Sequence, residues 1–290
     1  MIEELMTFIA VVEHKNFTKA AEAIHLSQPS VSLHIRHLEE YFGTILIQRS
    51  VKQKTIYITE AGNLLYERSK QIIRILEDTK DDFLDYSNII KGKLRIGASF
   101  TIGEYFLPSF LGQFNKRYPD LELEVIIENT HNICEKMNNY QVDIALIEGS
   151  VTSSNYEIHH FYEDNMVLAV PYNHYLMNQN YSIEELRNQT WISRERGSGT
   201  REYLEYFLST NNINAKNVIV FGSNFSIKEA VKNNLGITFI SSMVVESSLN
   251  DKELSILKTP HEYTRAFSYI LPKGIIPSKA VQVFIDLLKQ

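Results

Sequence analysis

The 290-residue sequence predicts an α/β protein in which a winged helix-turn-helix is joined by one long helix to a larger, two-lobed domain. Three observations support this fold class. Two short capped helices and a basic hairpin occupy the first segment, an uninterrupted helical pattern follows, and alternating strand and helix patterns fill the remainder. We therefore expect a small domain at residues 1–58, a linker helix with its hinge at 59–90, and the larger domain at 91–290.

Residues 17–39 are expected to form two short helices separated by a tight turn. Thr18 is expected to cap the first helix and Ser27 the second through their side-chain hydroxyls. Pro29 is tolerated in the first turn of the second helix because the amide there has no intrahelical partner. Apolar residues at the spacing of buried helix faces are Ala20, Ala21 and Ile24 in the first helix and Val31, Ile35 and Leu38 in the second.

The exposed side of the second helix is polar and suited to DNA. Its side chains can donate and accept hydrogen bonds along base edges and can reach phosphates. The residues predicted to contact DNA from this segment are Thr18, Ser27, Gln28, Pro29, Ser30, Ser32, Leu33, His34 and Arg36. A capped amphipathic hairpin with a solvated polar face explains the same pattern without DNA. The helical pattern alone leaves both interpretations open.

A basic hairpin is predicted directly after these helices. Two short alternating segments, 46–49 and 55–58, flank a loop and have the pattern of paired strands. Arg49, Lys52 and Lys54 place positive charge on this hairpin, although the net charge of the chain is −6. The net charge argues against nonspecific coating of nucleic acid, and the local placement suits a wing that grips the DNA backbone.

A long helix is predicted from Thr59 to about Tyr86, since this stretch has no proline and only one glycine. At 1.5 Å per residue it extends about 40 Å, which is too long for the first domain alone to cover. We expect it to pair with a second subunit, although Arg68 and Thr79 interrupt the apolar seam and packing on its own domain is the alternative. The seam consists of Ala61, Leu65, Ile72, Ile75, Leu76 and Phe83.

Alternating strand and helix patterns after a hinge at residues 88–93 predict an α/β domain with a mainly parallel sheet. A strand at 161–171 is expected to leave the first lobe and a strand at 263–271 to return to it. Two crossings imply two lobes with a cleft between them. The expected division is lobe I at 91–163 and 266–290, and lobe II at 164–265.

A glycine-rich segment, 193–201, is the main candidate for ligand binding. Its glycines permit tight turns, Ser198 and Thr200 can cap the next helix, and the start of that helix offers unpaired amides. Its arginines, with Arg196 among them, add charge that favours a small anion; an ordinary glycine turn with exposed arginines is the alternative. With the strand ends, the predicted ligand residues are Ser99, Thr101, Asn129, Thr130, Gly149, Arg194, Ser198, Gly199, Thr200, Arg201, Asn224 and Phe225.

Several of these segments resemble the LysR-type transcriptional regulators. The resemblance covers essentially the whole chain, and its second half is similar to that family's effector domain, which has the fold of periplasmic solute-binding proteins. Leu33 departs from the family pattern, because many relatives carry a polar or basic residue there; contact with a thymine methyl can replace a base hydrogen bond. The matching residues are Ala20-Ala21, Ser27 to Ser32, Ile35, Leu38-Glu39, Gly43, Leu46, Arg49 and Ile58 to Gly62.

The resemblance implies a regulator that binds double-stranded operator DNA and responds to an effector held between the two lobes. Because the sequence has neither a membrane-span pattern nor a basic secretory start, we expect it in the cytoplasm. It also implies a dimer formed through the linker helix, with a tetramer as the expected assembly, and RNA polymerase as a further candidate partner. The segment Arg194 to Arg201 resembles a loop of the subgroup that governs sulfur assimilation and carbon fixation. This favours a small anionic effector, with sulfur-containing metabolites or inorganic sulfur anions as the leading candidates.

Other classes of function are disfavoured. The sequence contains no Gly-x-Ser-x-Gly elbow, spaced metal-ligand pair, Walker loop or Rossmann fingerprint, so we expect no enzymatic activity, metal or cofactor. Cys134 is the single cysteine, which excludes an internal disulfide and suggests a small, half-buried residue. No apolar run approaches the roughly 18 residues of a membrane span, and a basic secretory start is absent. With the amino-terminal domain, this argues against a secreted solute-binding protein.

Overall fold

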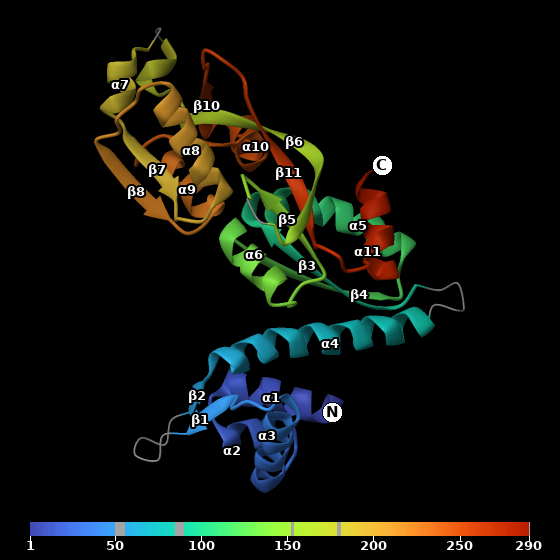
Figure 1. Ribbon diagram of the computed structural model, residues 1–290. Coiled ribbons are helices and arrows are strands. Elements are labelled where there is room, and N and C mark those ends of the chain that lie inside the picture. Colours follow the sequence, from blue (N-terminus) through green and yellow to red (C-terminus); the bar gives the residue numbers. More distant parts are fainter. Residues whose placement is uncertain (50–55, 85–89, 152–153, 179–180, 290) are drawn as a thin grey trace. The chain divides into compact units, whose positions relative to one another are not determined.

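The computed structural model describes residues 1–49, 56–84, 90–151, 154–178 and 181–289. The chain divides into two compact units, Met1–Tyr86 and Ser87–Gln290 (Figure 1). Among the described helices, none combines the length and apolar character needed to cross a membrane.

The first unit is a winged helix-turn-helix followed by one long helix. Its hydrophobic core joins the helices and the small sheet through residues such as Phe8, Ala20, Val31 and Leu38, which have no exposed surface. The two strands are antiparallel, with Ile47 opposite Ile58. The elements are α1 (Ile2–His14), α2 (Phe17–Ala23), α3 (Gln28–Phe42), β1 (Ile47–Arg49), β2 (Ile56–Ile58) and α4 (Glu60–Leu84).

The cap of α2 differs from the sequence prediction. Asn16, not Thr18, caps this helix, since the Asn16 side chain accepts hydrogen bonds from the amides of Thr18 and Lys19 at 2.9 and 3.0 Å. The helix begins at Phe17, so Thr18 lies inside the first turn, where its own amide needs an acceptor. The predicted cap of α3 is confirmed, because Ser27 Oγ accepts a hydrogen bond from the Ser30 amide at 3.2 Å.

Helix α4 changes its surroundings along its length. Leu65 is buried in the core of the first unit, and Gly62 lies so close to the strand segment that an added Cβ would be 2.3 Å from the Leu46 carbonyl oxygen. Further along, Ile72, Ile75 and Phe83 are exposed. Beyond the first turns, this part of the apolar seam is therefore exposed in the described structure.

The described part of the second unit contains a seven-stranded mixed sheet. Its strand order is β10 (Leu254–Leu257), β6 (Tyr156–Pro171), β11 (Tyr263–Pro272), β5 (Ile144–Glu148), β3 (Gly92–Ser99) and β4 (Leu121–Glu128), with β9 (Thr238–Ser241) also paired to β6. Strand β3 is parallel to β4 and β5, but the pairs β5–β11, β11–β6, β6–β10 and β6–β9 are antiparallel. The prediction of a mainly parallel sheet was therefore wrong for the sheet as a whole. The physical reason is that β6 (Tyr156–Pro171) leaves one lobe and β11 (Tyr263–Pro272) returns beside it in the opposite direction.

Lobe I packs helices on both faces of its strands (Figure 1). Along β5, Ile144 and Leu146 belong to the core that includes α5 and α11, whereas Ala145 and Ile147 belong to the core that includes α6. This alternation is the two-residue period of a strand buried on both faces. The elements of lobe I are β3 (Gly92–Ser99), a π-helical turn (Ile102–Phe106), α5 (Leu107–Arg117), β4 (Leu121–Glu128), α6 (Thr130–Asn138), β5 (Ile144–Glu148) and α11 (Lys279–Leu288).

Lobe II has its own core, in which Trp191, Phe207 and Phe239 are buried together. Strand β7 is parallel to β8, and the segment Arg194 to Ser198 connects β7 to α8. The elements of lobe II are a 3₁₀ helix (Tyr175–Asn178), α7 (Ile183–Arg187), β7 (Thr190–Arg194), α8 (Gly199–Thr210), β8 (Asn217–Phe221), α9 (Asn224–Lys232), β9 (Thr238–Ser241), α10 (Ser242–Asn250) and β10 (Leu254–Leu257).

Candidate functional site

The outward face of α3 carries exposed groups suited to DNA. Leu33 is 49% exposed, as a contact with a thymine methyl requires. Arg36 Nε lies 2.9 Å from Glu40 Oε1, and 75% and 62% of these side chains are exposed. Such an exposed pair contributes little stability, so Arg36 can exchange Glu40 for a DNA phosphate or base at small cost. Gln28 Nε2 donates to Ser32 Oγ at 2.9 Å on the same helix.

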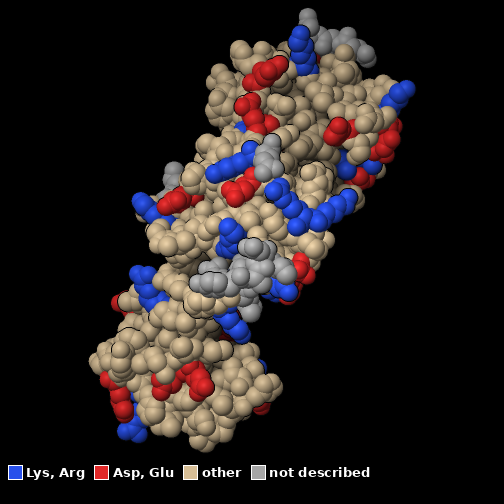
Figure 2. Space-filling view, turned by 90° about the vertical axis from the view of Figure 1, so that its right-hand side faces the viewer, with Lys and Arg blue, Asp and Glu red and all other residues tan. Residues whose placement is uncertain are grey.

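Other residues predicted to contact DNA have structural partners. His34 Nδ1 lies 2.8 Å from Thr7 Oγ1, so this half-buried ring faces α1. Ser27 caps α3, and its Oγ also lies 2.7 Å from Ser30 Oγ. The side chain of Arg49, together with Lys52 and Lys54 of the wing, lies outside the described residues. On the face of the molecule in Figure 2, basic and acidic side chains are interspersed.

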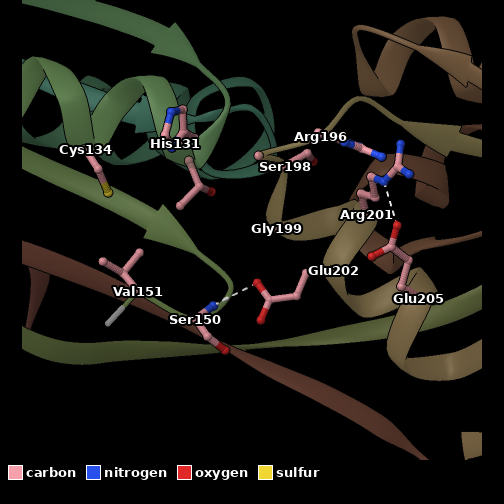
Figure 3. Close-up of a pocket in the computed structure, with 12 residues that line it drawn as sticks. His131, Cys134, Ser150, Val151, Arg196, Ser198, Gly199, Arg201, Glu202 and Glu205 are labelled. Carbon is pink, nitrogen blue, oxygen red and sulfur yellow. Dashed lines mark hydrogen bonds and ion pairs between the residues drawn. The ribbon is translucent and has the colours of Figure 1, made fainter. Parts of the chain in front are cut away.

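A cavity of about 620 Å³ lies between the two lobes of the second unit (Figure 3). Lobe I contributes the first turn of α6 and the segment after β5, and lobe II contributes the glycine-rich loop and the first turns of α8. The lining residues are Thr130, His131, Cys134, Ser150, Val151, Arg196, Gly197, Ser198, Gly199, Arg201, Glu202 and Glu205.

The start of α8 offers unused hydrogen-bond donors to this cavity. Ser198 occupies the N-cap position, yet its side chain makes no capping bond, and its buried Oγ has no partner among the described residues. For the amides of Gly199, Thr200 and Arg201, the described part of the chain supplies no acceptor. Gly199 approaches Glu148 so closely that a Cβ would be 2.3 Å from its carbonyl oxygen, which explains why a glycine stands there.

The arginine and glutamate side chains of the cavity differ in their availability to a ligand. Arg196 is exposed, and no ion pair or hydrogen bond is recorded for it among the described residues. Arg201 Nε donates to Glu205 Oε1 at 2.7 Å. Glu202 Oε2 accepts the Ser150 amide of lobe I at 3.1 Å, which links the lobes across the cavity (Figure 3). Within the described part of the chain, Arg196 is therefore the unpaired arginine of the lining, Arg201 is paired with Glu205, and Glu202 bridges the lobes.

Arg194 is buried and its charge is matched. Its Nε and Nη2 donate to the two carboxylate oxygens of Glu195 at 2.7 and 2.8 Å, and its Nη1 donates to Asn224 Oδ1 at 2.8 Å. Burial opposes ionisation of Glu195, but the hydrogen bonds and charge of Arg194 outweigh it and hold the pKa of Glu195 below its usual value. The guanidinium of Arg194 thus binds residues of the protein itself, Glu195 and Asn224.

A second buried arginine connects segments of both lobes. Arg265 Nε donates to Asp164 Oδ2 at 2.7 Å. Its Nη2 donates to Thr101 Oγ1 at 2.9 Å, and its Nη1 donates to Thr200 Oγ1 at 3.2 Å. Thr200 in turn donates to Glu148 Oε1 at 3.1 Å, so strand ends of lobe I and the start of α8 share one polar network.

The structure distributes the predicted ligand residues over three environments. Thr130, Ser198, Gly199 and Arg201 line the cavity. Thr101, Arg194, Thr200 and Asn224 belong to the buried polar network. Among the others, Ser99 is buried and its hydroxyl has no hydrogen-bond partner in the described part of the chain, Asn129 caps α6 and donates to Glu195, Gly149 adjoins Glu202, and Phe225 is exposed on α9.

Several residues at this site were not identified from the sequence. Arg265 was detectable in principle, because Arg265, Phe267 and Tyr269 alternate along β11 on a buried face. His131 and Cys134 gave no local signal, since they face the cavity only through the placement of α6. Burial raises the pKa of the Cys134 thiol to about 11, so this cavity residue remains a neutral thiol at pH 7.

Comparisons with known proteins match both units. A model of bacterial regulatory helix-turn-helix proteins of the lysR family matches residues 2–63, and a LysR substrate binding domain model matches residues 88–290. The chain is 45% identical to the HTH-type transcriptional regulator CysL of Bacillus subtilis, over 98% of this chain and 95% of that protein. It is 32% identical to a probable RuBisCO transcriptional regulator of Phaeodactylum tricornutum, over 100% of this chain and 96% of that protein.

Among solved structures, the second unit is similar to the regulatory domain of CcmR from Synechocystis PCC6803 in complex with 2-PG. The TM-score is 0.62 at 27% identity, and the match covers 69% of this chain and 96% of that domain.

Proposed function

The chain belongs to the LysR family of DNA-binding transcriptional regulators, and on this premise we propose that a small anion, bound in the cavity at the start of α8, controls how the protein engages its operator DNA. Relatives of this family are regulators, not enzymes.

The observation that carries this proposal is the set of unused donors at the start of α8. Ser198 Oγ is buried and has no hydrogen-bond partner among the described residues, and the first amides of α8 lie at the positive end of the helix dipole. Arg196 adds a charge that no described carboxylate neutralises. Helix α6 of lobe I begins at the same cavity, with Thr130 and His131 in its lining. Two helix N-termini from opposite lobes thus favour negative charge in one place.

Carboxylates in the cavity limit which anions fit. Glu202 and Glu205 repel an anion, although Glu205 is paired with Arg201 and Glu202 is held by the Ser150 amide. A compact anion that stays beside Ser198 and Arg196 avoids most of this repulsion. We propose inorganic sulfur anions or small sulfur-containing metabolites, supported by the similarity to CysL.

Because residues of both lobes line the cavity, a bound ligand can control the arrangement of the lobes. An anion that contacts α6 and α8 together stabilises one arrangement of the lobes, and it shifts the equilibrium only by its preference for that arrangement. We propose that the exposed apolar face of α4 pairs two subunits, which places two α3 helices on one operator, and that dimers assemble into tetramers. We also propose that the protein acts in the cytoplasm and that RNA polymerase is a further partner.

The test is a thermal-unfolding series on the full chain with sulfate, sulfite and thiosulfate, against chloride at equal ionic strength. A ligand at 100 times its Kd stabilises the folded state by roughly 2.7 kcal/mol, so a specific anion should raise the melting temperature of the second unit. Arg196→Gln should lose this response, whereas Arg117→Gln on α5, outside the cavity lining, should keep it. Equal melting temperatures in all salts would contradict the proposal.

A further inference from the structure

Two histidines of α3 form hydrogen bonds to α1. His34 Nδ1 lies 2.8 Å from Thr7 Oγ1, and His37 Nδ1 lies 3.0 Å from Glu4 Oε1. The partners are three residues apart on each helix and run in opposite order, as expected for neighbouring antiparallel helices. Both bonds leave Nε2 of the ring uninvolved. Helix α3 is thereby tied to α1 at two successive turns on one side.

The direction of the Thr7–His34 bond follows from a second contact. Thr7 Oγ1 also lies 2.8 Å from the Glu3 carbonyl oxygen, which can only accept a hydrogen bond. The hydroxyl has one hydrogen, and if it pointed at His34, two oxygen lone pairs would face each other at 2.8 Å. Thr7 therefore donates to Glu3 and accepts from His34 Nδ1–H. This selects the ring form that carries a proton on Nδ1.

The location of His34 argues against direct reading of bases. The side chain is half-buried and faces α1, beside the buried stripe that includes Val31 and Ile35. Leu33 and Arg36 lie on the exposed side of the same helix. Since successive residues of a helix differ by about 100° around its axis, a ring that faces α1 cannot share the direction of Leu33.

We propose that Thr7 is a positioning residue for DNA recognition, which sets the rotation of α3 about its axis by accepting the His34 Nδ1–H. The apolar stripe of α3 packs without directional bonds, so it permits small rotations that the hydrogen bond prevents. A side chain that contacts DNA loses its contact when it is displaced by a fraction of an ångström to about 1 Å. The Thr7–His34 hydrogen bond therefore affects DNA binding indirectly, because it fixes the positions of Arg36 and Leu33. Thr7 itself is 1% exposed and reaches no DNA.

The first test compares Thr7→Val with Thr7→Ser in the full chain. Valine keeps the shape of threonine but removes the acceptor, whereas serine keeps the hydroxyl. We expect Thr7→Val to weaken binding to the DNA upstream of the chain's own gene by roughly tenfold, the effect of one lost hydrogen bond that leaves a donor unpaired. Binding to unrelated DNA should be unchanged, because it depends on phosphate contacts. Thr7→Ser should bind both DNAs within about twofold of the parent chain.

The second test uses the two amide substitutes of His34. In His34→Asn the side-chain NH₂ stands near the position of Nδ1, so it can still donate to Thr7; in His34→Gln it stands near Nε2 and cannot. We expect Asn to retain specific DNA binding and Gln to lose it by a factor similar to that of Thr7→Val. His34 is half-buried, so these two variants decide the matter even if Thr7→Val fails to fold.

Two results would overturn the assignment. In the first case, His34→Gln would retain specific DNA binding and His34→Asn would lose it, which would make His34 a direct DNA contact through Nε2. In the second case, Thr7→Val and His34→Gln would lose specific binding, nonspecific binding and unfolding free energy together. The hydrogen bond would then stabilise the fold without positioning α3 on DNA.

Discussion

Arg36 of the first unit and Arg265 of the second make ion pairs of nearly equal length in opposite surroundings. The Arg36–Glu40 pair spans 2.9 Å with 75% and 62% of the side chains exposed, whereas the Arg265–Asp164 pair spans 2.7 Å with neither side chain exposed. Water solvates and screens the first pair, so its arginine is available to DNA. The second is isolated from water and joins β6 to β11, the two strands that cross between the lobes. Contact distance alone therefore does not tell whether a cation is available to a ligand.

The same difference separates two arginines of one loop. Arg194 is buried against Glu195 and Asn224, while Arg196, two positions later, is exposed without a recorded partner in the described chain. Both are cations in a segment whose composition predicts anion binding. Of these two, Arg196 lines the cavity. Long-range packing, not local composition, buries one arginine and leaves the other exposed at the cavity.

The largest expected effect comes from breaking the buried pair. Asp164→Ala leaves Arg265 buried without its shortest ion-pair partner, and we expect a loss of about 3–5 kcal/mol in unfolding free energy. Trp191 is buried in lobe II and is the single tryptophan, so its fluorescence in a urea titration reports this loss.

The matched change in the exposed pair is Glu40→Ala, which should cost less than about 1 kcal/mol by circular dichroism. Similar costs for the two substitutions would remove the distinction between the pairs.

The next effect concerns DNA affinity. Arg36→Ala should weaken binding to the upstream DNA by about 1–3 kcal/mol while changing the unfolding free energy by less than about 0.5 kcal/mol. Fluorescence anisotropy at several salt concentrations measures both the affinity and its salt slope. A phosphate contact should reduce that slope by about 0.9. Arg117→Ala in the second unit is the control and should leave the affinity unchanged. If Arg36→Ala also left the affinity unchanged, Arg36 would not be a DNA contact.

A smaller effect is expected at the carboxylate bridge in the cavity. Glu202→Gln keeps an oxygen that accepts the Ser150 amide but removes the negative charge. Sulfate, titrated calorimetrically, should then bind more tightly by roughly fivefold, which corresponds to about 1 kcal/mol of relieved repulsion in an aqueous setting. Weaker binding would mean that Glu202 supports the ligand instead of repelling it.

The smallest effect is a change in acid stability. The pKa of Glu195 lies below its usual value in the folded chain, so its ionised form stabilises the fold above the unfolded pKa of about 4.3, and this contribution is lost as pH falls through the folded pKa. Between pH 5.5 and 3, Glu195→Gln should therefore lose stability less steeply than the parent chain in urea titrations. Parallel pH profiles would indicate that Arg194 does not depend on this partner.

Features that depend on residues close together in the sequence were predictable, whereas features that depend on distant residues were not. The buried stripe of α3, its Ser27 cap and the two wing strands depend on neighbours within a few residues, and they were predicted correctly. The cap of α2 was assigned to Thr18, but the helix begins earlier, at Phe17, which makes Asn16 the cap.

The polar network of the second unit was not predictable in this way. Arg265 meets Thr101, Asp164 and Thr200, which are far apart in the chain, and only the crossing of β6 and β11 brings them together. The mixed direction of the sheet was missed for the same reason, since strand order is a property of the connections between lobes. Composition identified the glycine-rich loop, but it gave no information on which of its arginines would be buried.

DNase footprinting of the full chain on the DNA upstream of its own gene, with and without the anion that stabilises it, tests the central claim most directly. The account predicts protection of a specific segment whose boundaries or strength change when the anion is added, and Arg196→Gln should keep the protection but lose the change. Absence of specific protection, or an identical anion response in Arg196→Gln, would contradict a regulator controlled from the cavity at the start of α8.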